Sequence, residues 1–382
     1  MKLSICMIVK NEEELLPGCL ESIDGVGDGI ILVDTGSEDD TAHIAEEFGC
    51  KVFHHPWQDS FSEARNFADV QAAGEWRMCI DADERLERAD ARMIYKAMEI
   101  ENVNAVAFRM LNQMPCGVLQ HWLDRMWRDG EAHFEGIKHN QLVFEGERAF
   151  VPIRVYHLGY NLSPEKMHKK NERDEILLKK QVAEDKTNAF AWSGLMRLYR
   201  CQELWGQAID TYNEFDMMVL SDMAQHTPLS FQKMKLDMLC ALTAEKRYIE
   251  AEMIGRELIS HYPQNPDTYF HMGALCRKKV EDEKAIQYFQ QYLVVIRFIK
   301  SRNVASSIPI ETWGSEAQAI NDIGFCLCRQ GRYVQALSAF ENAVNADPET
   351  EQYKNNYNVI LNNLVSTGGE RGAENVNAEK PQ

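Results

Sequence analysis

The sequence WRMCIDADE at residues 76–84 is the stretch that decides the fold class we predict. Its first half, Trp76–Ile80, is a short apolar run of the kind that forms a buried strand, and carboxylates follow directly at Asp81 and Asp83. Two carboxylates at a strand end offer the hard oxygen ligands that a divalent cation prefers. An isolated Asp-x-Asp pair is more often a solvated acidic turn, so the surrounding residues decide between the two interpretations.

Apolar segments before this stretch alternate with helical patterns. Continuous apolar runs at residues 3–9 and 30–33, together with Val52-Phe53, predict three more strands, and the second of them is followed directly by Asp34. Strands that alternate with helices predict a largely parallel sheet of the α/β class. The binding site of such a sheet lies at the carboxyl ends of its strands.

Length and composition indicate a globular protein of two domains. The chain has 382 residues, of which 45% are hydrophobic, so it can bury more than one core. A net charge of −18 argues against binding to nucleic acid or to an anionic membrane through bulk electrostatics. The 10 cysteines include no CxxC pair, which is typical of reduced thiols in a cytoplasmic protein. Without an apolar run of about 20 residues, we expect no transmembrane segment.

Beyond about residue 163 the sequence is almost entirely helical and contains a repeat. The tetratricopeptide spacing of aromatic, leucine and small residues can be followed four times. Its small-residue positions, where paired helices approach closely, are Ala208, Ala251, Ala285 and Ala336. We therefore predict an α/β domain at residues 1–162, a connecting helix at 163–187, tetratricopeptide-like helical repeats at 188–365 and a disordered tail at 366–382.

Four motifs in the first half of the chain follow one another in a set order. They are SICMIVKNEE at residues 4–13, VDTGSEDDT at 33–41, SEARNFA at 62–68 and the Asp-x-Asp stretch. Together they closely resemble the family 2 glycosyltransferases of the GT-A fold, and in particular the tetratricopeptide-linked branch that includes the sublancin-type peptide S-glycosyltransferase. The motifs are specific over residues 1–160, and the resemblance extends more loosely over the repeats.

The resemblance implies a Rossmann-like, mostly parallel GT-A domain followed by an all-α tetratricopeptide-repeat domain. It also implies inverting transfer of a hexosyl group from a nucleotide diphosphate-sugar, usually a UDP-sugar. The implied donor-binding residues are Lys10, Asn11, Glu12, Asp34, Arg65 and Asp81. A carboxylate such as Asp34 can accept from a base or from ribose hydroxyls, and Arg65 suits phosphate. The plainer alternatives are that Asp34 caps a helix or turn and that Arg65 pairs with a local carboxylate on the same helix.

A divalent cation, Mg or Mn, is the cofactor that the resemblance implies. Its ligands would be Asp81, Asp83 and His157, and Asp83 would serve catalysis because the cation neutralises the leaving diphosphate. His157 stands where many such folds supply a histidine to the metal or to the diphosphate. A lone histidine after a strand is about as often structural.

The general base is the point at which the sequence departs from the family. Residues 127–140, WRDGEAHFEGIKHN, are similar to a family stretch that usually ends in His-Glu, whereas here it ends in His139-Asn140. Asparagine cannot take a proton, so Glu135, Asp124 and Asp129 are candidate substitutes. Alternatively the acceptor ionises readily by itself, as a thiol does, or the enzyme is impaired.

The leading hypothesis is metal-dependent sugar transfer to a protein, a peptide or a cell-envelope glycan. The repeats would recruit this acceptor or mediate formation of a homodimer. Trp122 and Trp127 are candidates for stacking against a sugar or an acceptor, or else for core packing. The alternative from another class is a non-catalytic adaptor with a degenerate transferase lobe. Asn140 favours the adaptor, whereas the joint retention of the donor-site carboxylates and Arg65 opposes it.

Overall fold

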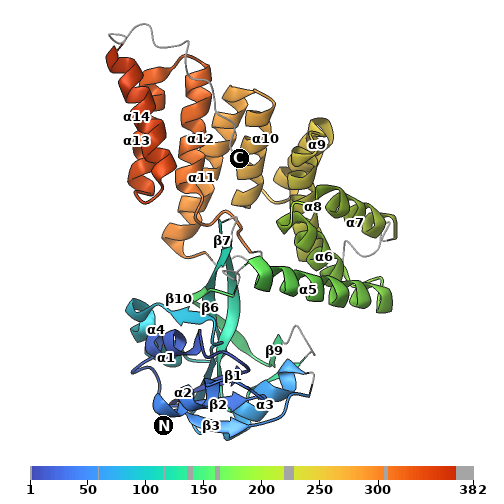
Figure 1. The fold of residues 1–382 in the computed structure, drawn as a ribbon, viewed down its shortest axis with the longest axis vertical. Coiled ribbons are helices and arrows are strands. Elements are labelled where there is room, and N and C mark those ends of the chain that lie inside the picture. Colours follow the sequence, from blue (N-terminus) through green and yellow to red (C-terminus); the bar gives the residue numbers. More distant parts are fainter. Residues whose placement is uncertain are drawn as a thin grey trace. The chain divides into compact units, whose positions relative to one another are not determined.

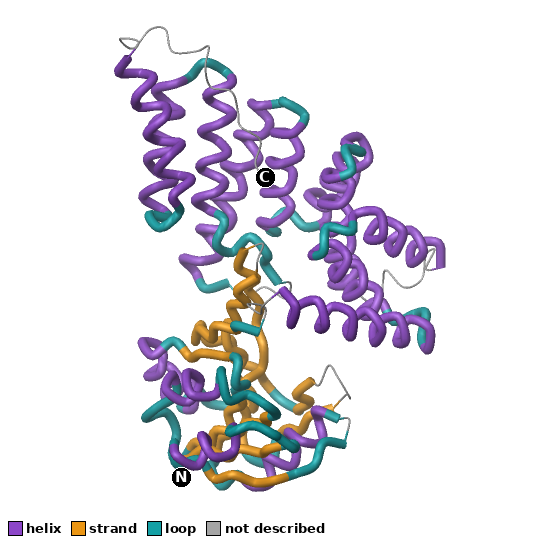
Figure 2. Tube along the Cα trace, viewed as in Figure 1, coloured by secondary structure: helices purple, strands orange, loops and turns teal. Residues whose placement is uncertain are grey.

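The computed structural model describes residues 2–58, 60–114, 117–135, 141–159, 164–218, 228–304 and 309–366. The chain forms two compact units. The first consists of Met1–Pro115, Leu119–Leu162 and Ala305–Pro309, and the second of Cys116–Val118, Ser163–Val304 and Ile310–Gln382. The first unit contains the sheet, whereas the second is helical (Figures 1 and 2).

An eight-stranded sheet forms the frame of the first unit, in the order β3-β2-β1-β4-β7-β6-β10-β5. These strands are β1 (Leu3–Val9), β2 (Gly29–Asp34), β3 (Lys51–His54), β4 (Trp76–Cys79), β5 (Glu84–Leu86), β6 (Val103–Met114), β7 (Gly117–Arg128) and β10 (Glu147–His157). A separate antiparallel pair consists of β8 (Ala132–Glu135) and β9 (Gln141–Phe144). The helices of this unit are α1 (Leu16–Ser22), α2 (Thr41–Glu47), α3 (Phe61–Gln71) and α4 (Ala91–Met98), with a short 3-10 helix at Arg88–Asp90.

The first four strands confirm the predicted parallel arrangement. β1 pairs in parallel with β2 and with β4, and β2 pairs in parallel with β3. The carboxyl ends of all four strands therefore reach the same edge of the sheet. The rest of the sheet is mixed, because β7 runs antiparallel to β4 and β5 antiparallel to β10, while β6 and β10 are parallel.

Apolar side chains on both faces of β1 explain its central position. Leu3, Ile5 and Met7 are fully buried in one apolar cluster, together with residues of α1 and α4. Side chains alternate along a strand, so Cys6 faces the other way, where it packs in a second cluster with Ala68 of α3. Helices thus cover both faces of the parallel strands, as parallel sheets require. This packing fixes the carboxyl edge on which the predicted site residues lie.

The second unit is a series of paired helices. They are α5 (Pro164–Glu184), α6 (Ala189–Cys201), α7 (Trp205–Met218), α8 (Pro228–Ala244), α9 (Tyr248–His261), α10 (Pro266–Lys278), α11 (Asp282–Arg302), α12 (Glu316–Arg329), α13 (Tyr333–Ala346) and α14 (Glu351–Ser366). The four predicted small residues lie one each in α7, α9, α11 and α13, and all are fully buried. Gly324 of α12 lies so close to Phe340 of α13 that a Cβ atom there would be 2.7 Å from the ring. This close pairing confirms the tetratricopeptide-like architecture.

Helix α5 corresponds to the predicted connecting helix, and it packs within the repeat unit. Leu178 lies in the same apolar cluster as Trp192 of α6, and the Tyr199 hydroxyl donates a hydrogen bond to Glu175 at 2.9 Å. Beyond Ser366, the predicted disordered tail lies outside the described residues. Among the residues that are described, no helix combines the length and the apolarity needed to cross a bilayer.

The segment between α11 and α12 ties distant helices of the second unit together. Asp267 accepts hydrogen bonds from the main-chain N–H groups of Glu311 and Thr312, both at 2.9 Å, and from the Thr312 hydroxyl at 2.6 Å. The Glu311 carboxylate pairs with Arg197 at 3.1 Å and with Arg200 at 2.6 Å. Burial alone would raise the pKa of Glu311, but the two guanidinium groups lower it to about 2.

His271 of α10 gives the repeat unit a testable dependence on pH. Burial, with a further contribution from the charge of Arg200, lowers the pKa of His271 to about 4 from its ordinary value of 6.5. The neutral imidazole is therefore favoured in the folded state. Its contribution to stability is complete above about pH 6.5 and is lost as the pH falls toward 4. We expect this loss to reach roughly 3 kcal/mol.

The measurement is the free energy of unfolding against pH for the parent and for His271→Gln. Asp237 and Asp267, whose pKa values burial raises to about 6, titrate in the same window with the opposite sign, so the informative quantity is the difference between the two proteins. An NMR titration of the His271 ring gives the pKa directly. A value at or above 6 would contradict the prediction.

Candidate active site

The loops that follow β1 and β2 interlock at the carboxyl edge of the sheet. Asn11 accepts a hydrogen bond from the Glu38 N–H at 2.8 Å through its side-chain oxygen, and its own N–H donates to the Ser37 hydroxyl at 3.0 Å. The Glu12 N–H donates to the Thr41 hydroxyl at 2.8 Å. Asn11 has a φ of 55°, in the left-handed region that asparagine tolerates better than most residues. The two predicted donor-binding motifs are thus held side by side.

Asp34 lies at the end of β2 and is buried. One carboxylate oxygen accepts from the Ser37 N–H at 3.0 Å and from the Ser37 hydroxyl at 2.5 Å. The other oxygen lies 3.2 Å from Nδ1 of His54, which is exposed. One oxygen of Asp34 therefore stabilises the turn that follows β2, and the other oxygen faces the exposed side chain of His54. Lys10 is exposed at the end of β1.

Asp81 is held between two arginines, the buried Arg125 and the largely buried Arg65. Arg65 of α3 donates to one carboxylate oxygen at 2.6 Å, and Arg125 of β7 lies 3.5 Å from the other. Burial alone would raise the pKa of Asp81, but the two guanidinium groups lower it to about 2. Arg65 thus pairs with a carboxylate outside its own helix, and that carboxylate is the predicted donor-site residue Asp81.

Glu84 and Arg125 complete a closed set of contacts beneath the Asp-x-Asp turn. Glu84 is 2% exposed, accepts a hydrogen bond from the Asp81 N–H at 2.9 Å and forms an ion pair with Arg125. Burial, reinforced by the charge of Asp81, raises the pKa of Glu84 to about 7 although Arg125 opposes the shift. Arg125 also approaches the Cys79 thiol at 3.5 Å. One buried guanidinium therefore orients the whole turn.

Asp83 lies beside His157, as the predicted metal site requires. Nε2 of His157 is 3.0 Å from Oδ2 of Asp83, and the Leu158 N–H donates to the Asp83 carbonyl at 2.8 Å. Burial alone would lower the pKa of His157, but the hydrogen bond and charge of Asp83 outweigh it and raise the pKa. A Cβ atom at Gly159 would be 2.2 Å from Oδ2 of Asp83, so only glycine leaves this pair room.

Among the described residues, protein atoms alone do not form a complete metal centre. Within the described part of the chain, no three His, Cys, Asp or Glu side chains gather closely enough to hold a metal ion. Asp81 turns to the arginines, whereas Asp83 and His157 place one oxygen and one nitrogen donor together. Two protein donors suit a cation whose remaining ligands come from a diphosphate and water.

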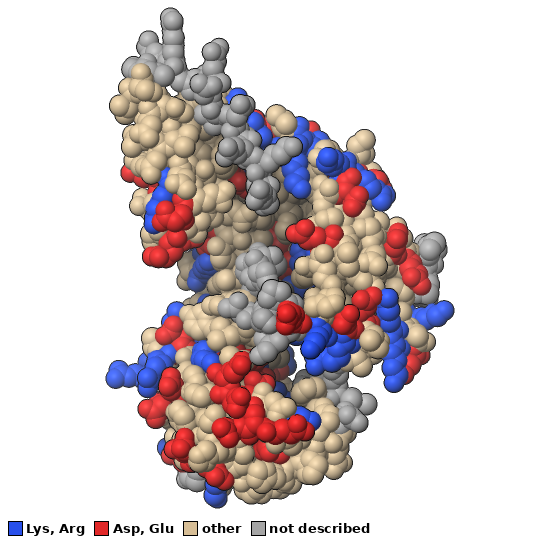
Figure 3. Space-filling view, in the orientation of Figure 1, with Lys and Arg blue, Asp and Glu red and all other residues tan. Residues whose placement is uncertain are grey.

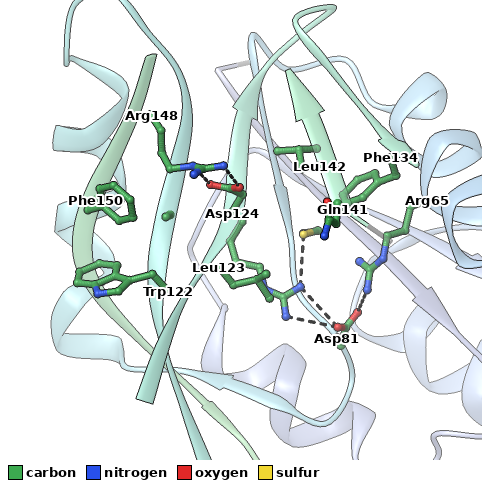
Figure 4. A pocket seen from close by; sticks show the side chains of 13 residues that line it. Arg65, Asp81, Trp122, Leu123, Asp124, Phe134, Gln141, Leu142, Arg148 and Phe150 are labelled. Carbon is green, nitrogen blue, oxygen red and sulfur yellow. Dashed lines mark hydrogen bonds and ion pairs between the residues drawn. The ribbon is translucent and has the colours of Figure 1, made fainter. Parts of the chain in front are cut away.

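A pocket of about 430 Å³ opens beside Asp81 (Figure 4). This volume lies within the range of about 300–1,000 Å³ that is usual for small-molecule sites. Its lining residues are Arg65, Cys79, Asp81, Ala107, Trp122, Leu123, Asp124, Arg125, Phe134, Gln141, Leu142, Arg148 and Phe150. Figure 4 shows Asp81 beside Arg65 at one end, and Asp124 facing Arg148 at the other.

The candidate bases occupy different surroundings. Asp124 lines the pocket, whereas Glu135 is 64% exposed, lies 2.9 Å from Nε2 of His133 and borders a separate, open hollow along α3. Asp129 pairs with Arg77 at 2.7 Å. The departure at His139-Asn140 lies outside the described residues.

The two tryptophans considered for stacking also lie in different surroundings. Trp122 lines the pocket, but Trp127 is 1% exposed and its indole N–H donates to Asp69 at 3.0 Å. The stacking role considered for Trp127 is therefore wrong, because this side chain packs in the core against Phe134.

Arg125, Glu84 and Arg148 are site residues that the sequence analysis missed. Arg125 and Arg148 each place a charge within a strand-forming stretch, and this charge is the sequence signal that could identify them as site residues. A buried charge in a strand needs a partner from elsewhere in the fold. Glu84 directly follows Asp83, so the sequence does not distinguish it from the other carboxylates of the acidic turn.

The first unit has the GT-A type of fold that the sequence predicts. The predicted donor-binding motifs follow the parallel strands β1 and β2, and the Asp-x-Asp turn follows β4. Strands from the mixed part of the sheet line the rest of the pocket. Residues 4–162 match the family model of glycosyl transferase family 2, so the N-terminal unit is a family 2 glycosyltransferase domain.

Two curated relatives match part of the chain. A TPR repeat-containing protein of Synechococcus elongatus is 51% identical over 85 residues, which are 22% of this chain and 21% of that protein. The SPbeta prophage-derived glycosyltransferase SunS of Bacillus subtilis is 30% identical over 178 residues, 44% of this chain and 42% of that protein. Each match thus spans less than half of the relative. Among solved structures, TarS of S. aureus aligns over 65% of this chain and 55% of that chain, with 16% identity and a TM-score of 0.32.

Proposed function

We propose that this protein transfers a sugar from a nucleotide diphosphate-sugar to an acceptor. One observation carries the proposal: Asp34 at the end of β2, Arg65 of α3 and the Asp81–Asp83 turn after β4 come from three separate parts of the chain and lie at the carboxyl edge of a family 2 glycosyltransferase domain. That edge is where open α/β sheets bind nucleotides. In the reaction, the bond between the anomeric carbon and the diphosphate oxygen breaks, and a new bond forms from that carbon to the acceptor.

Recognition of the nucleotide falls to the interlocked loops after β1 and β2. Asp34 accepts hydrogen bonds from the base or the ribose, and Lys10, Asn11 and Glu12 lie along the same edge. Arg65 then turns toward the diphosphate, because an arginine can bind phosphate through two parallel hydrogen bonds. Arg125 keeps Asp81 in place while this exchange occurs. UDP is the nucleotide that the family resemblance favours.

Asp83 and His157 would hold the divalent cation. Their donor atoms already lie 3.0 Å apart, so a cation can replace the proton between them. When bound, Mg or Mn supplies positive charge to the leaving diphosphate. The surface supports this assignment, because acidic side chains gather on the face of the first unit seen in Figure 3 and the chain has a net charge of −18. Without a cation, such a surface repels a diphosphate.

The repeats are proposed to present a protein or peptide acceptor, or a cell-envelope glycan, to the catalytic unit. Tetratricopeptide-like arrays offer extended surfaces that suit such partners. A homodimer through the repeats is the other role they can serve. We place the reaction in the cytoplasm, where nucleotide-sugars of this kind are available to a protein rich in free cysteines.

A donor screen tests the proposal without an acceptor. Calorimetry with UDP-glucose, UDP-N-acetylglucosamine and GDP-mannose, with Mg, with Mn and with EDTA, is expected to find metal-dependent binding of at least one donor. A folded parent protein that binds no nucleotide-sugar under any of these conditions would favour the adaptor hypothesis instead.

Asp34→Asn is expected to weaken donor binding by about ten- to a hundred-fold, because hydrogen bonds to a charged acceptor are worth about 1.5–3 kcal/mol. Asparagine retains an oxygen for the Ser37 contacts, so the turn should persist. The matched control is Asp24→Asn, since Asp24 is 81% exposed and lies before β2, away from the carboxyl edge. An unchanged dissociation constant for Asp34→Asn would remove Asp34 from the site.

A further inference from the structure

The end of the pocket away from Asp81 has a chemistry of its own. Trp122 and Phe150 meet edge to face with ring centroids 5.5 Å apart, and Asp124 and Arg148 form an ion pair beside them (Figure 4). None of these residues contacts the Asp-x-Asp turn through a hydrogen bond that the described structure shows. The pocket therefore has a donor end, defined by Asp81 and Arg65, and an aromatic end.

The Asp124–Arg148 pair combines a shielded carboxylate with an accessible cation. Nε and Nη2 of Arg148 lie 2.7 Å from the two oxygens of Asp124, one contact to each. The Asp124 side chain is 15% exposed and that of Arg148 42%. Arg148 also lies over Phe144 and Phe150, at 5.2 and 6.0 Å from the ring centroids. An exposed arginine with aromatic support can move aside without leaving its cation–π contacts entirely.

Asp124 is the carboxylate of this pocket that remains suited to accept a proton. Of the described residues that line the pocket, Asp81 and Asp124 are the carboxylates, and Asp81 pairs with two arginines whereas Asp124 pairs with Arg148. Glu135 is exposed outside the pocket. Burial raises the pKa of Asp124, although Arg148 opposes the shift, and a raised pKa makes a carboxylate a better base.

We propose that the aromatic end is the acceptor subsite, that Asp124 is the general base for an alcohol hydroxyl, and that Arg148 is a positioning residue. This inference rests on the proposed glycosyl transfer. The acceptor O–H gives its proton to a carboxylate oxygen of Asp124, and the oxygen's electron pair forms the bond to the anomeric carbon. The bond from that carbon to the diphosphate breaks, and its electrons leave with the nucleoside diphosphate.

The preference for a hydroxyl follows from the need for a base. A thiol ionises near neutral pH and gains little from a positioned carboxylate, whereas an alcohol depends on one. The Trp122–Phe150 surface adds an apolar face against which a sugar ring or an aliphatic side chain can pack. The acceptor class is therefore an alcohol hydroxyl on a sugar, serine or threonine.

The test compares hydroxyl and thiol acceptors in the full-length protein. The donor is the nucleotide-sugar selected by the screen, and the acceptor probes are water, glycerol, N-acetylserine amide and N-acetylcysteine amide. For Asp124→Asn we expect release of nucleoside diphosphate with the hydroxyl probes to fall about 100-fold or more. Turnover with the thiol should fall less than about tenfold, and the donor dissociation constant should stay within about threefold. The control variant is again Asp24→Asn.

A second variant reports on Arg148 through the pH profile. The acid limb of turnover with glycerol should have its midpoint at the pKa of Asp124. Arg148→Gln removes the cation that lowers this pKa, so the midpoint should move to higher pH. A purely structural role for Arg148 would lower turnover at every pH and leave the midpoint in place.

Several results would overturn the inference. Asp124→Asn could match the parent with hydroxyl probes, or it could lose hydroxyl transfer, thiol transfer and donor affinity together, as a distorted pocket would. A parent that binds the donor but gives no turnover with any hydroxyl probe also contradicts it. Failure of the underlying proposed function is distinguishable, because the parent would then bind no nucleotide-sugar at all.

Discussion

Asp83→Ala should reduce nucleotide-sugar turnover at least about 100-fold while the protein stays folded. Asp83 contacts His157 at 3.0 Å, and the two are the proposed protein ligands of the cation that neutralises the leaving diphosphate. Such charge stabilisation is worth several kcal/mol, and each 1.4 kcal/mol is about a factor of ten in rate. The measurement is release of nucleoside diphosphate with saturating donor and Mg or Mn.

The matched control for this variant is Asp24→Ala, which removes an exposed carboxylate from the same unit and should leave the rate unchanged. Thermal unfolding of both variants shows whether the fold survives. If Asp83→Ala turned over at the parental rate, or if EDTA left the parent fully active, the proposed metal site would be wrong. Lost turnover with an unchanged circular dichroism spectrum would support it.

Arg125→Met should destabilise the first unit by about 3–5 kcal/mol, the usual cost of leaving a buried charge without its partner. Glu84 is 2% exposed and depends on Arg125 for compensation, and Asp81 loses one of its two cations at the same time. Urea unfolding of the parent and the variant measures the difference. Arg88→Met is the control, because Arg88 pairs with Asp24 at 3.7 Å on the surface, where such pairs contribute at most about 1 kcal/mol.

The double variant Arg125→Met with Glu84→Gln separates this explanation from simple loss of packing. Removing the uncompensated charge should restore a large part of the lost stability, since a neutral amide costs less to bury than a carboxylate. If the double variant were as unstable as the sum of the two single variants, the buried ion pair would not be the cause.

The parallel half of the sheet was predictable because burial on both faces leaves a continuous apolar run. The predicted runs at residues 3–9, 30–33 and 76–80 became β1, β2 and β4, with ends shifted by at most one residue. Strand β7 was not predicted, because it carries Asp124 and Arg125 among its apolar residues. Arg125 pairs with Asp81 and Glu84, and Asp124 pairs with Arg148, all of which lie elsewhere in the sequence.

The donor motifs identified the right region, but their pairings depend on the tertiary fold. Asp83 and His157 are 74 residues apart in sequence, so no local pattern shows that they meet. The same limit applies to Trp122 and Trp127, which have similar neighbours in one strand. Trp127 is buried because α3 places Asp69 within reach of its indole N–H, whereas Trp122 faces the pocket.

The contacts of Glu311 affect how the helical unit should respond when one of its repeats is lost or destabilised. Arrays of helical repeats usually gain stability only between adjacent neighbours, so they can fray from either end. Here a carboxylate that precedes the last repeat is bound by Arg200, 111 residues earlier. Loss of Glu311 together with the repeat that follows it would therefore remove a partner from both Arg197 and Arg200, near the start of the array. We expect the array to unfold in a single cooperative step. A destabilising change near either end should therefore lower the free energy of unfolding of the whole array.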